Sequence, residues 1–371
     1  MFPNIPLHRI NWPTTIFLCA TFLLTVIGVP IYVWHFGIDL FQIGLFLFYF
    51  WASAMSITLG YHRLFSHRAF KAKWPVRLAT LLFGSCAFEN SALDWSADHR
   101  RHHKHVDEEE DPYNINKGFF WAHMGWLLVR LSCRKPEGVN DLLKDRMVMW
   151  QHRYTHIIGV VVGLILPAAL GYWWDGWVGA LGGFLIAGVA RVVAVQHSTF
   201  FINSLCHTVG KRPYDTRTSA RDSWIMAIFT FGEGYHNYHH SFQHDYRNGV
   251  KPWQYDPTKW VIWALAKLGL ASELRRVAPE KIVLTELREA RRQSERKIAK
   301  LAAAKADAAC PYWQKTSAAL HELSEAVAKS YAELEKAVAD RVTVSKEVLE
   351  KWRMQAAELL DALSHAEHAH A

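Results

Sequence analysis

Asp98-His99-Arg100-Arg101-His102-His103-Lys104-His105 is the stretch that decides how this 371-residue chain is interpreted. Each residue of an α-helix advances by about 100°. His103 therefore returns to within about 40° of His99, and His102 lies within about 60° on the other side. Three imidazoles share one helical face, which can supply ligands to a metal ion. A single cluster also fits a basic face near a membrane, so the interpretation depends on matching ligands elsewhere.

Two further histidine clusters provide such ligands. The run Gly232-Glu233-Gly234-Tyr235-His236-Asn237-Tyr238-His239-His240 repeats the i, i+3, i+4 spacing with His236, His239 and His240. His62 and His67 are five residues apart, a spacing that turns them about 140° from each other on a regular helix. We therefore expect His62 and His67 either to bind different metal ions or to straddle a helix end. The recurrence of histidine clusters argues against a chance origin.

The number of imidazoles indicates which metal chemistry to expect. Zinc usually closes its coordination with four ligands, whereas these clusters hold eight histidines. Such a set favours two octahedral-type ions with room for oxygen. Soluble di-iron sites use Glu-x-x-His pairs, and none occurs at the required places. We therefore predict an all-histidine site for two iron ions. Each ligand should pass its second N–H to an acceptor, for which Asp98, Asp111 and Glu233 are the nearby candidates.

Long apolar runs indicate that the clusters belong to a membrane protein. Four runs, at about 14–34, 40–60, 157–174 and 177–195, are long enough to span a bilayer and form two hairpins. Buried helices of a soluble protein are the alternative. The hairpin links contain no Lys or Arg, whereas residues 61–156 and the sequence after 200 are rich in both. The positive-inside rule then places both termini and every histidine cluster on the cytoplasmic side.

The predicted fold class is all-α: an integral membrane four-helix, two-hairpin bundle whose cytoplasmic helical cap carries the histidine-rich di-iron site. The membrane domain would cover 1–278, with the cap formed by 61–156 and 200–278. Composition then shifts to Ala, Glu, Lys and Arg, and apolar residues recur at spacings of three and four. Residues 279–371 are therefore predicted to form a charged, coiled-coil-like helical extension, for which a solvated appendage is the simplest interpretation.

The net charge limits the classes of partner to expect, and the cysteine pattern indicates the cellular compartment. The net charge of +8 favours an anionic partner or an anionic membrane surface. Nucleic acid is not expected, because no binding motif accompanies the charge. The five cysteines contain no CxxC pair, which fits a reducing, cytosol-facing location.

With these motifs in hand, the chain resembles the membrane-bound Δ9 fatty-acyl desaturases, the stearoyl-CoA desaturase family. The resemblance covers roughly residues 10–260. The matching segments are Gly60-Tyr61-His62-Arg63-Leu64-Phe65-Ser66-His67-Arg68, Asp98 to His103, Asp111-Pro112-Tyr113-Asn114, Gly118-Phe119-Phe120, Gly125-Trp126-Leu127-Leu128, Asn203-Ser204-Leu205-Cys206-His207, Arg212-Pro213-Tyr214-Asp215 and 232–240.

The resemblance implies site residues that spacing alone does not identify. His207 would be a ninth histidine ligand, and Asn203 would reach a metal through water. Asn90, Trp95 and Asp98 would contact the substrate. Trp95 and Thr199 would line the bend of a tunnel that places the acyl chain against the metals.

The tunnel end and the substrate's head group are less closely defined. Phe50 and Ala54 would map to the end of the tunnel, with lipid-facing or packing roles as the alternative. The family's CoA-contacting arginine corresponds to Ala97. An acyl-carrier protein or an acyl-lipid therefore remains open beside acyl-CoA. Other basic residues could hold a phosphate or meet anionic lipid instead, namely Arg100, Arg101, Lys104 and Lys117.

We therefore expect an O2-dependent di-iron enzyme that inserts a cis double bond, at Δ9, into a saturated long-chain acyl-CoA for unsaturated fatty acid biosynthesis. No cytochrome b5 signature is apparent in the sequence, so the expected electron donor is a separate ferredoxin, rubredoxin or cytochrome b5. The alternatives are an acyl-lipid desaturase, a membrane di-iron hydroxylase or alkane monooxygenase, and a non-catalytic membrane scaffold whose C-terminal helix recruits partners.

Overall fold

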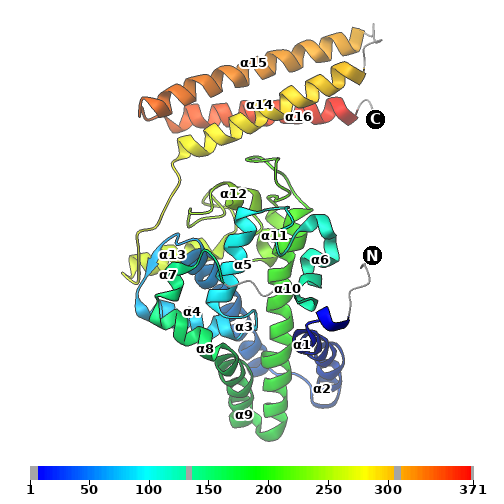
Figure 1. Ribbon diagram of the computed structural model, residues 1–371, viewed down its shortest axis with the longest axis vertical. Helices are drawn as coiled ribbons and strands as arrows, with labels where there is room; N and C mark the ends of the chain where they lie inside the picture. The colour runs from blue at the N-terminus through cyan, green and yellow to red at the C-terminus, as the bar shows by residue number, and fades with distance from the viewer. Residues whose placement is uncertain (1–6, 131–135, 305–310, 369–371) are drawn as a thin grey trace. The chain divides into compact units, whose positions relative to one another are not determined.

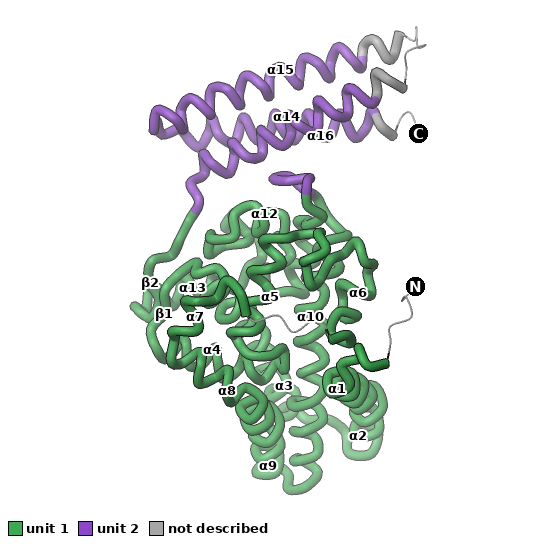
Figure 2. The backbone as a smooth tube through the Cα atoms, in the orientation of Figure 1, with its two compact units in different colours: residues 1–211, 218–276 green, residues 212–217, 277–371 purple. Residues whose placement is uncertain are grey.

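The computed structural model describes residues 7–130, 136–304 and 311–368, almost all of them helical or in short connections (Figure 1). The chain divides into two compact units (Figure 2). The first consists of Met1–Lys211 and Thr218–Arg276, and the second of Arg212–Arg217 and Val277–Ala371.

Within the described residues, three helices of the first unit are long and apolar enough to cross a membrane: Trp12–Phe36, Leu40–Ser66 and Arg146–His207. The first comprises α1 (Trp12–Leu23), η2 (Leu24–Gly28) and α2 (Val29–Phe36). The second comprises α3 (Leu40–Met55) and η3 (Ser56–Ser66). Gly37 separates them with a φ of 76°, which a residue without Cβ adopts readily. Asp39 then begins α3 through a capping box with Gln42.

The third of these helices folds back on itself. It runs through α8 (Arg146–Val160), η6 (Val161–Ile165), α9 (Leu166–Gly182), η7 (Gly183–Ala190), α10 (Arg191–Ser204) and η8 (Leu205–His207). Asp175 and Gly176 have non-helical backbone angles. The backbones on either side approach closely, because a Cβ on Gly171 would lie 2.0 Å from the carbonyl oxygen of Gly179. The break falls at the expected hairpin link, and α9 packs against η7 as the chain returns toward α10 (Figure 1).

The remaining elements of the first unit belong mostly to the segments predicted to form the cytoplasmic cap. They are η1 (Leu7–Arg9), β1 (Lys71–Ala72), α4 (Trp74–Ser85), α5 (Ala92–Lys104), η4 (Ile115–Lys117), α6 (Phe119–His123), η5 (Gly125–Leu128), α7 (Asn140–Leu143), α11 (Trp224–Phe229), α12 (His236–Ser241), α13 (Pro257–Lys267) and β2 (Ala271–Ser272). The two short strands pair antiparallel, with Lys71 opposite Ser272. A buried cluster that includes Leu59, Leu81, Leu93 and Ile262 packs η3 against α4, α5 and α13.

A buried arginine stabilises the junction between the membrane helices and the loop that leads to α5. Arg191 is fully buried. Its guanidinium donates to the carbonyls of Gly163 at 2.7 Å and Ala187 at 3.1 Å, and also to that of Cys86. These carbonyls belong to η6, η7 and the end of α4. One cation therefore satisfies backbone oxygens from three segments that have no water available.

The second unit is a bundle of α14 (Pro279–Ala304), α15 (Pro311–Ala339) and α16 (Lys346–His368). Leu287, Leu334, Leu359 and Leu363 are fully buried in its core. The sequence predicted a charged helical extension with a solvated appendage as its simplest interpretation, whereas the described residues of this unit pack around a hydrophobic core. The segment 212–217 belongs to this unit through its contacts with α14.

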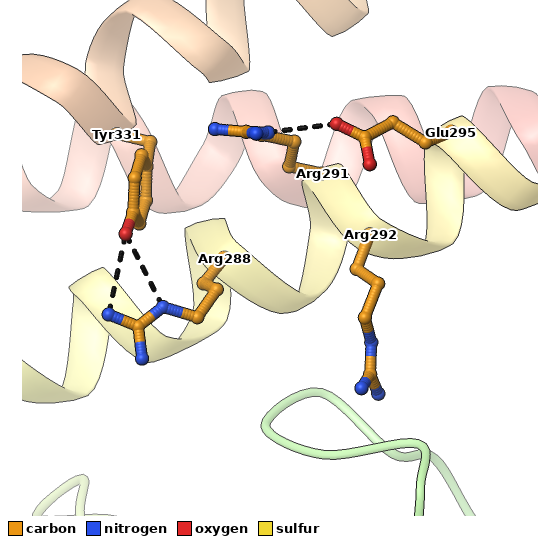
Figure 3. A pocket seen from close by; sticks show the side chains of 5 residues that line it. All are labelled: Arg288, Arg291, Arg292, Glu295 and Tyr331. Atoms are coloured by element: carbon orange, nitrogen blue, oxygen red, sulfur yellow. Dashed lines mark hydrogen bonds and ion pairs between the residues drawn. The ribbon is translucent and has the colours of Figure 1, made fainter.

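The bundle also carries a shallow, arginine-rich hollow of about 280 Å³ (Figure 3). Its charges are largely satisfied within the bundle: Arg288 donates to the Tyr331 hydroxyl at 3.3 Å, and Arg291 pairs with Glu295 at 2.9 Å. Arg292 pairs with Glu289 at 2.7 Å. The contact of Arg288 joins α14 to α15, whereas the other two ion pairs lie within α14.

Replacing Arg191 should destabilise the first unit. In Arg191→Met, the carbonyls of Cys86 and Gly163 lose their donor, at about 1–3 kcal/mol for each buried group left unpaired. We expect the melting temperature of the purified protein to fall by about 2–4 °C per kcal/mol. Arg153→Met, which removes an exposed arginine, is the matched control. Equal melting temperatures for the two variants would contradict the role given to Arg191.

Candidate metal centre

The nine histidines singled out from the sequence come together in two groups. One group comprises His62, His67, His99, His103 and His239, and the other His102, His207, His236 and His240. Within each group the candidate ligand nitrogens lie within 4.8 Å of one another. His207, expected only from the family resemblance, lies in the second group. Donor sets of this kind suit a transition-metal ion.

His62 and His67 lie in the same group because η3 is a π-helix. In a π-helix the backbone hydrogen bond joins residues i and i+5, and the amide of His67 donates to the carbonyl of His62 at 3.0 Å. The two ring centroids are 4.7 Å apart. The expectation that these histidines bind different ions assumed α-helical geometry and does not hold. His67 is the C-cap residue of η3, which agrees with the alternative of a pair at a helix end.

Each of the two short histidine motifs contributes to both groups. On α5, His99 and His103 belong to the five-histidine group, whereas His102 belongs to the four-histidine group. On α12 the division is reversed: His239 joins the five, and His236 and His240 join the four. Helical geometry explains this division, since residue i+4 lies about 40° from residue i in one direction, whereas residue i+3 lies about 60° from it in the other.

The Nε2 atoms of these rings point at one another. The separation is 2.8 Å for His67 and His99, 2.9 Å for His62 and His239, and 3.0 Å for His103 and His239. In the second group, His236 Nε2 lies 3.1 Å from His207 Nε2 and 3.0 Å from His240 Nε2. Such close packing of imidazole nitrogens is favourable when a cation accepts their lone pairs.

The outward-facing Nδ1 atoms of three ligands have acceptors. Glu233 Oε2 is 2.9 Å from His62 Nδ1, and Asp111 Oδ1 is 2.9 Å from His102 Nδ1. A carboxylate in this position keeps the proton on Nδ1 and leaves Nε2 free to bind a metal. Asp111 and Glu233 therefore lie where acceptors were expected. Asp98 instead pairs with Arg101 at 3.3 Å.

The acceptor for the third ligand was not foreseen. His207 Nδ1 lies 2.6 Å from the hydroxyl of Ser219, which donates to Asp107 at 2.5 Å. Neither Ser219 nor Asp107 belongs to a recognisable motif, and they are far apart in the sequence. Only the folded chain brings them to His207.

Buried ion pairs hold these acceptors in place. Arg63, which is 1% exposed, lies 3.0 Å from Glu233 and 3.0 Å from Asp256. Asp111 accepts backbone N–H groups from Tyr113 at 3.0 Å and Asp107 at 3.1 Å. Burial tends to raise the pKa of both carboxyls, but for Glu233 the charges of His62 and Arg63 lower it below the ordinary value. For Asp111, the interaction with His102 lowers the pKa in the same way.

Six of the candidate ligand imidazoles favour the neutral form. Burial, and then the neighbouring imidazoles, lower the pKa well below the ordinary value for His67, His99, His103, His236, His239 and His240. Neutral imidazole is the form that binds a metal ion. The chemistry of the donor set therefore fits metal ions at both groups.

A cavity of about 780 Å³ reaches the five-histidine group. His62 and His99 form part of its wall, together with apolar side chains from α1, η3, η6 and α10. The predicted substrate residues Asn90, Trp95, Asp98 and Thr199 line it, as does Asn203. Trp95 stacks on His99, with ring centroids 4.7 Å apart.

Phe50 and Ala54 do not line this cavity. Phe50 stacks on Phe46 and packs against Phe231, with ring centroids 5.9 and 5.7 Å apart. Ala54 is 4% exposed within the hydrophobic core. The contacts of Phe50 and Ala54 are those of packing residues, which was the alternative to a place at the end of the tunnel. Their role at the tunnel end stays a prediction.

Other cavity residues carried no signal in the sequence. Asn11, Glu89, Arg130 and His156 line the cavity. Arg100 was a candidate phosphate ligand, but it forms a two-pronged ion pair with Asp141 and does not line the cavity.

The remaining histidines have other partners. His105 lies 3.0 Å from Glu108 at the surface. His244 Nδ1 is 2.9 Å from the carbonyl of His67, so it supports the backbone of a candidate ligand. His123 lies between Ser204 and His197, at 2.9 and 3.0 Å.

Comparison with known proteins gives consistent matches. The model of the fatty acid desaturase family matches residues 40–273. The chain is 36% identical over 317 residues to acyl-CoA desaturase 1 of Saccharomyces cerevisiae, covering 83% of this chain and 60% of that protein. It is 45% identical over 231 residues to a probable acyl-CoA desaturase of Schizosaccharomyces pombe, covering 62% of this chain and 48% of that protein. Over 257 residues it is 37% identical to human stearoyl-CoA desaturase, covering 68% of this chain and 69% of that protein. The chain therefore spans about half to two thirds of the length of the curated relatives it matches.

Removing one ligand from either group should lower the metal content of the purified protein. We expect about two iron ions per chain from elemental analysis, and about one or none in His103→Ala and in His236→Ala, because each group loses an inward-facing nitrogen. His105→Ala removes a nearby histidine outside both groups and should retain the full content. Unchanged iron in both ligand variants would contradict the assignment of the two groups.

Proposed function

The chain belongs to the fatty acid desaturase family, and from this premise we propose that it inserts a cis double bond, at Δ9, into the saturated chain of a long-chain acyl-CoA. One observation carries the proposal. A largely apolar cavity has His62 and His99 in its wall, so the methylene groups of a bound chain would lie beside candidate metal ligands. The names of the relatives, acyl-CoA and stearoyl-CoA desaturases, support the substrate class.

The proposed metal ions are two irons, one held by each histidine group. Bound iron would supply the activation of O2 that removal of hydrogen from an unactivated methylene pair requires. In the overall reaction, the acyl chain loses two hydrogens, while O2, two electrons and two protons complete the formation of two water molecules. Glu233 and Asp111 contribute by holding His62 and His102 with Nε2 turned inward.

The protein's main contribution to the reaction is to position the chain and exclude water. Trp95 stacks on His99 and lines the cavity opposite segments of α10 that include Thr199 and Phe200. These side chains would fix which methylene pair faces the metals. At the exposed part of the wall, Arg130 and Asn11 are suited to a polar head group, whereas Ala97 is buried and 4% exposed.

We also propose that the first unit crosses the membrane four times, because the Arg146–His207 helix reverses at Asp175 and Gly176. The absence of Lys and Arg from the hairpin links supports cytoplasmic termini and a cytoplasmic metal centre. Electrons would come from a separate donor such as a ferredoxin, rubredoxin or cytochrome b5. The basic net charge favours association with such acidic proteins.

Expression in a host that lacks its own acyl desaturase tests the proposal. Gas chromatography and mass spectrometry of the host lipids should show a new cis monoene with the double bond at carbon 9. His239→Ala should yield none, because it removes a nitrogen from the five-histidine group. His105→Ala should give product at the unmodified level. A hydroxylated chain would instead indicate a hydroxylase, and no product with no bound metal would indicate a non-catalytic scaffold.

A further inference from the structure

Glu89 is an acidic side chain in the cavity wall that the proposed reaction does not use. It lies in the turn between α4 and α5. Its Oε2 accepts a hydrogen bond from Trp95 Nε1 at 3.3 Å. Its Oε1 is buried, and Thr199 is the other hydrogen-bonding partner of the carboxyl. Because no cation among the described residues pairs with this carboxyl, a negative charge on it would be poorly compensated.

The backbone holds Glu89 in place against local strain. Its two neighbours, Phe88 and Asn90, have φ angles of 55° and 68°, a region that residues with a Cβ rarely adopt. Such conformations cost about 1–3 kcal/mol each and persist where surrounding contacts enforce them. Gln196 Nε2 supplies those contacts by donating to the carbonyls of Ala87 at 3.2 Å and Phe88 at 3.3 Å. Arg191 holds the carbonyl of Cys86 in the same turn.

The surroundings of Glu89 favour its uncharged form. Burial raises the pKa of Glu89 to about 8, although hydrogen bonding with Thr199 and Trp95 offsets part of the increase. The titratable groups close enough to interact with it are the phenols of Tyr61 on η3 and Tyr113. Neither can supply a positive charge. The other ionisable side chains of the cavity wall are His62, Asp98, His99, Arg130, His156 and Glu233.

We propose that Glu89 is a positioning residue that admits the acyl chain to the cavity only while its carboxyl is uncharged. Trp95 connects it to the reaction centre, because this ring bonds to Glu89 on one side and stacks on His99 on the other. An acyl chain in the cavity displaces water from Glu89, so ionisation opposes binding. This inference rests on the proposed function and adds a dependence of substrate binding on pH.

The direction of the pH dependence follows from the protonated fraction. Below pH 8 most molecules carry neutral Glu89 and bind the chain with full affinity. Above pH 8 the fraction of molecules with protonated Glu89 falls by about tenfold per pH unit. The apparent affinity for the acyl chain falls by the same factor. The KM for the acyl substrate should therefore rise, while kcat at saturation should change little because every occupied molecule holds the protonated form.

Steady-state kinetics of the purified full-length, iron-loaded protein with stearoyl-CoA, O2 and a reduced ferredoxin as electron donor, between pH 6.5 and 9.5, test this inference. We expect the KM of the unmodified protein to rise about tenfold from pH 7 to pH 9. Glu89→Gln keeps the shape and the acceptor for Trp95 but cannot ionise, so its KM should vary by less than about twofold. Asp94→Asn removes a nearby carboxyl that does not line the cavity, and should behave as the unmodified protein.

A flat KM in the unmodified protein overturns the inference, whatever the variants do. So does an equal alkaline rise in Glu89→Gln, which would locate the titrating group elsewhere. A complete lack of stearoyl-CoA turnover at pH 7 in all three proteins would contradict the proposed function itself, and with it this role for Glu89.

Discussion

Convergence of nine imidazoles, seven of them buried, is the constraint on which the rest of the first unit depends. Lone pairs of neutral nitrogen do not attract one another, and charged imidazoles would repel, so a bound cation and a rigid surrounding structure would stabilise the arrangement. Two features of the chain meet this need. Acceptors at Nδ1, such as Glu233 and Asp111, set the direction of the rings. Buried ion pairs around Arg63 then hold Glu233 itself.

Helix geometry distributes the ligands between the two groups. The α-helical spacing of α5 and α12 separates the i+3 histidine from the i and i+4 pair, so each helix serves both groups. The π-helical η3 does the reverse, because it brings two histidines five residues apart to one side. A change of hydrogen-bond pattern over one segment thus supplies two ligands to one group. This fits the tendency of π-helical turns to occur at functional sites.

Much of this arrangement could be predicted from the sequence. The histidine motifs, the long apolar runs and the break at Asp175 and Gly176 are visible in residue type and spacing alone. The grouping of His62 with His67 was not, because nothing in the segment itself indicates a π-helix. The bundle core around Leu334 was missed because apolar residues at spacings of three and four do not show whether a helix packs or is solvated.

Glu89, Ser219 and Asp107 are single residues whose roles could not be predicted from the sequence at all. They owe their surroundings to contacts with distant parts of the chain: Glu89 with α10, and Ser219 with the loop that follows α5. No local pattern marks them. The resemblance to a known family identified His207 and Thr199, but it assigned no role to an ionisable carboxyl beside Trp95. The folded structure is needed to recognise that Glu89 shares the cavity wall with two candidate metal ligands.

The central claim is that two metal ions are bound separately, each by histidine alone from the protein. Anomalous diffraction from crystals of the iron-loaded protein, collected on both sides of the iron absorption edge, tests it most directly. The account predicts two iron peaks, one surrounded by His62, His67, His99, His103 and His239, and the other by His102, His207, His236 and His240. A single peak, or iron bound by carboxylates, would contradict it.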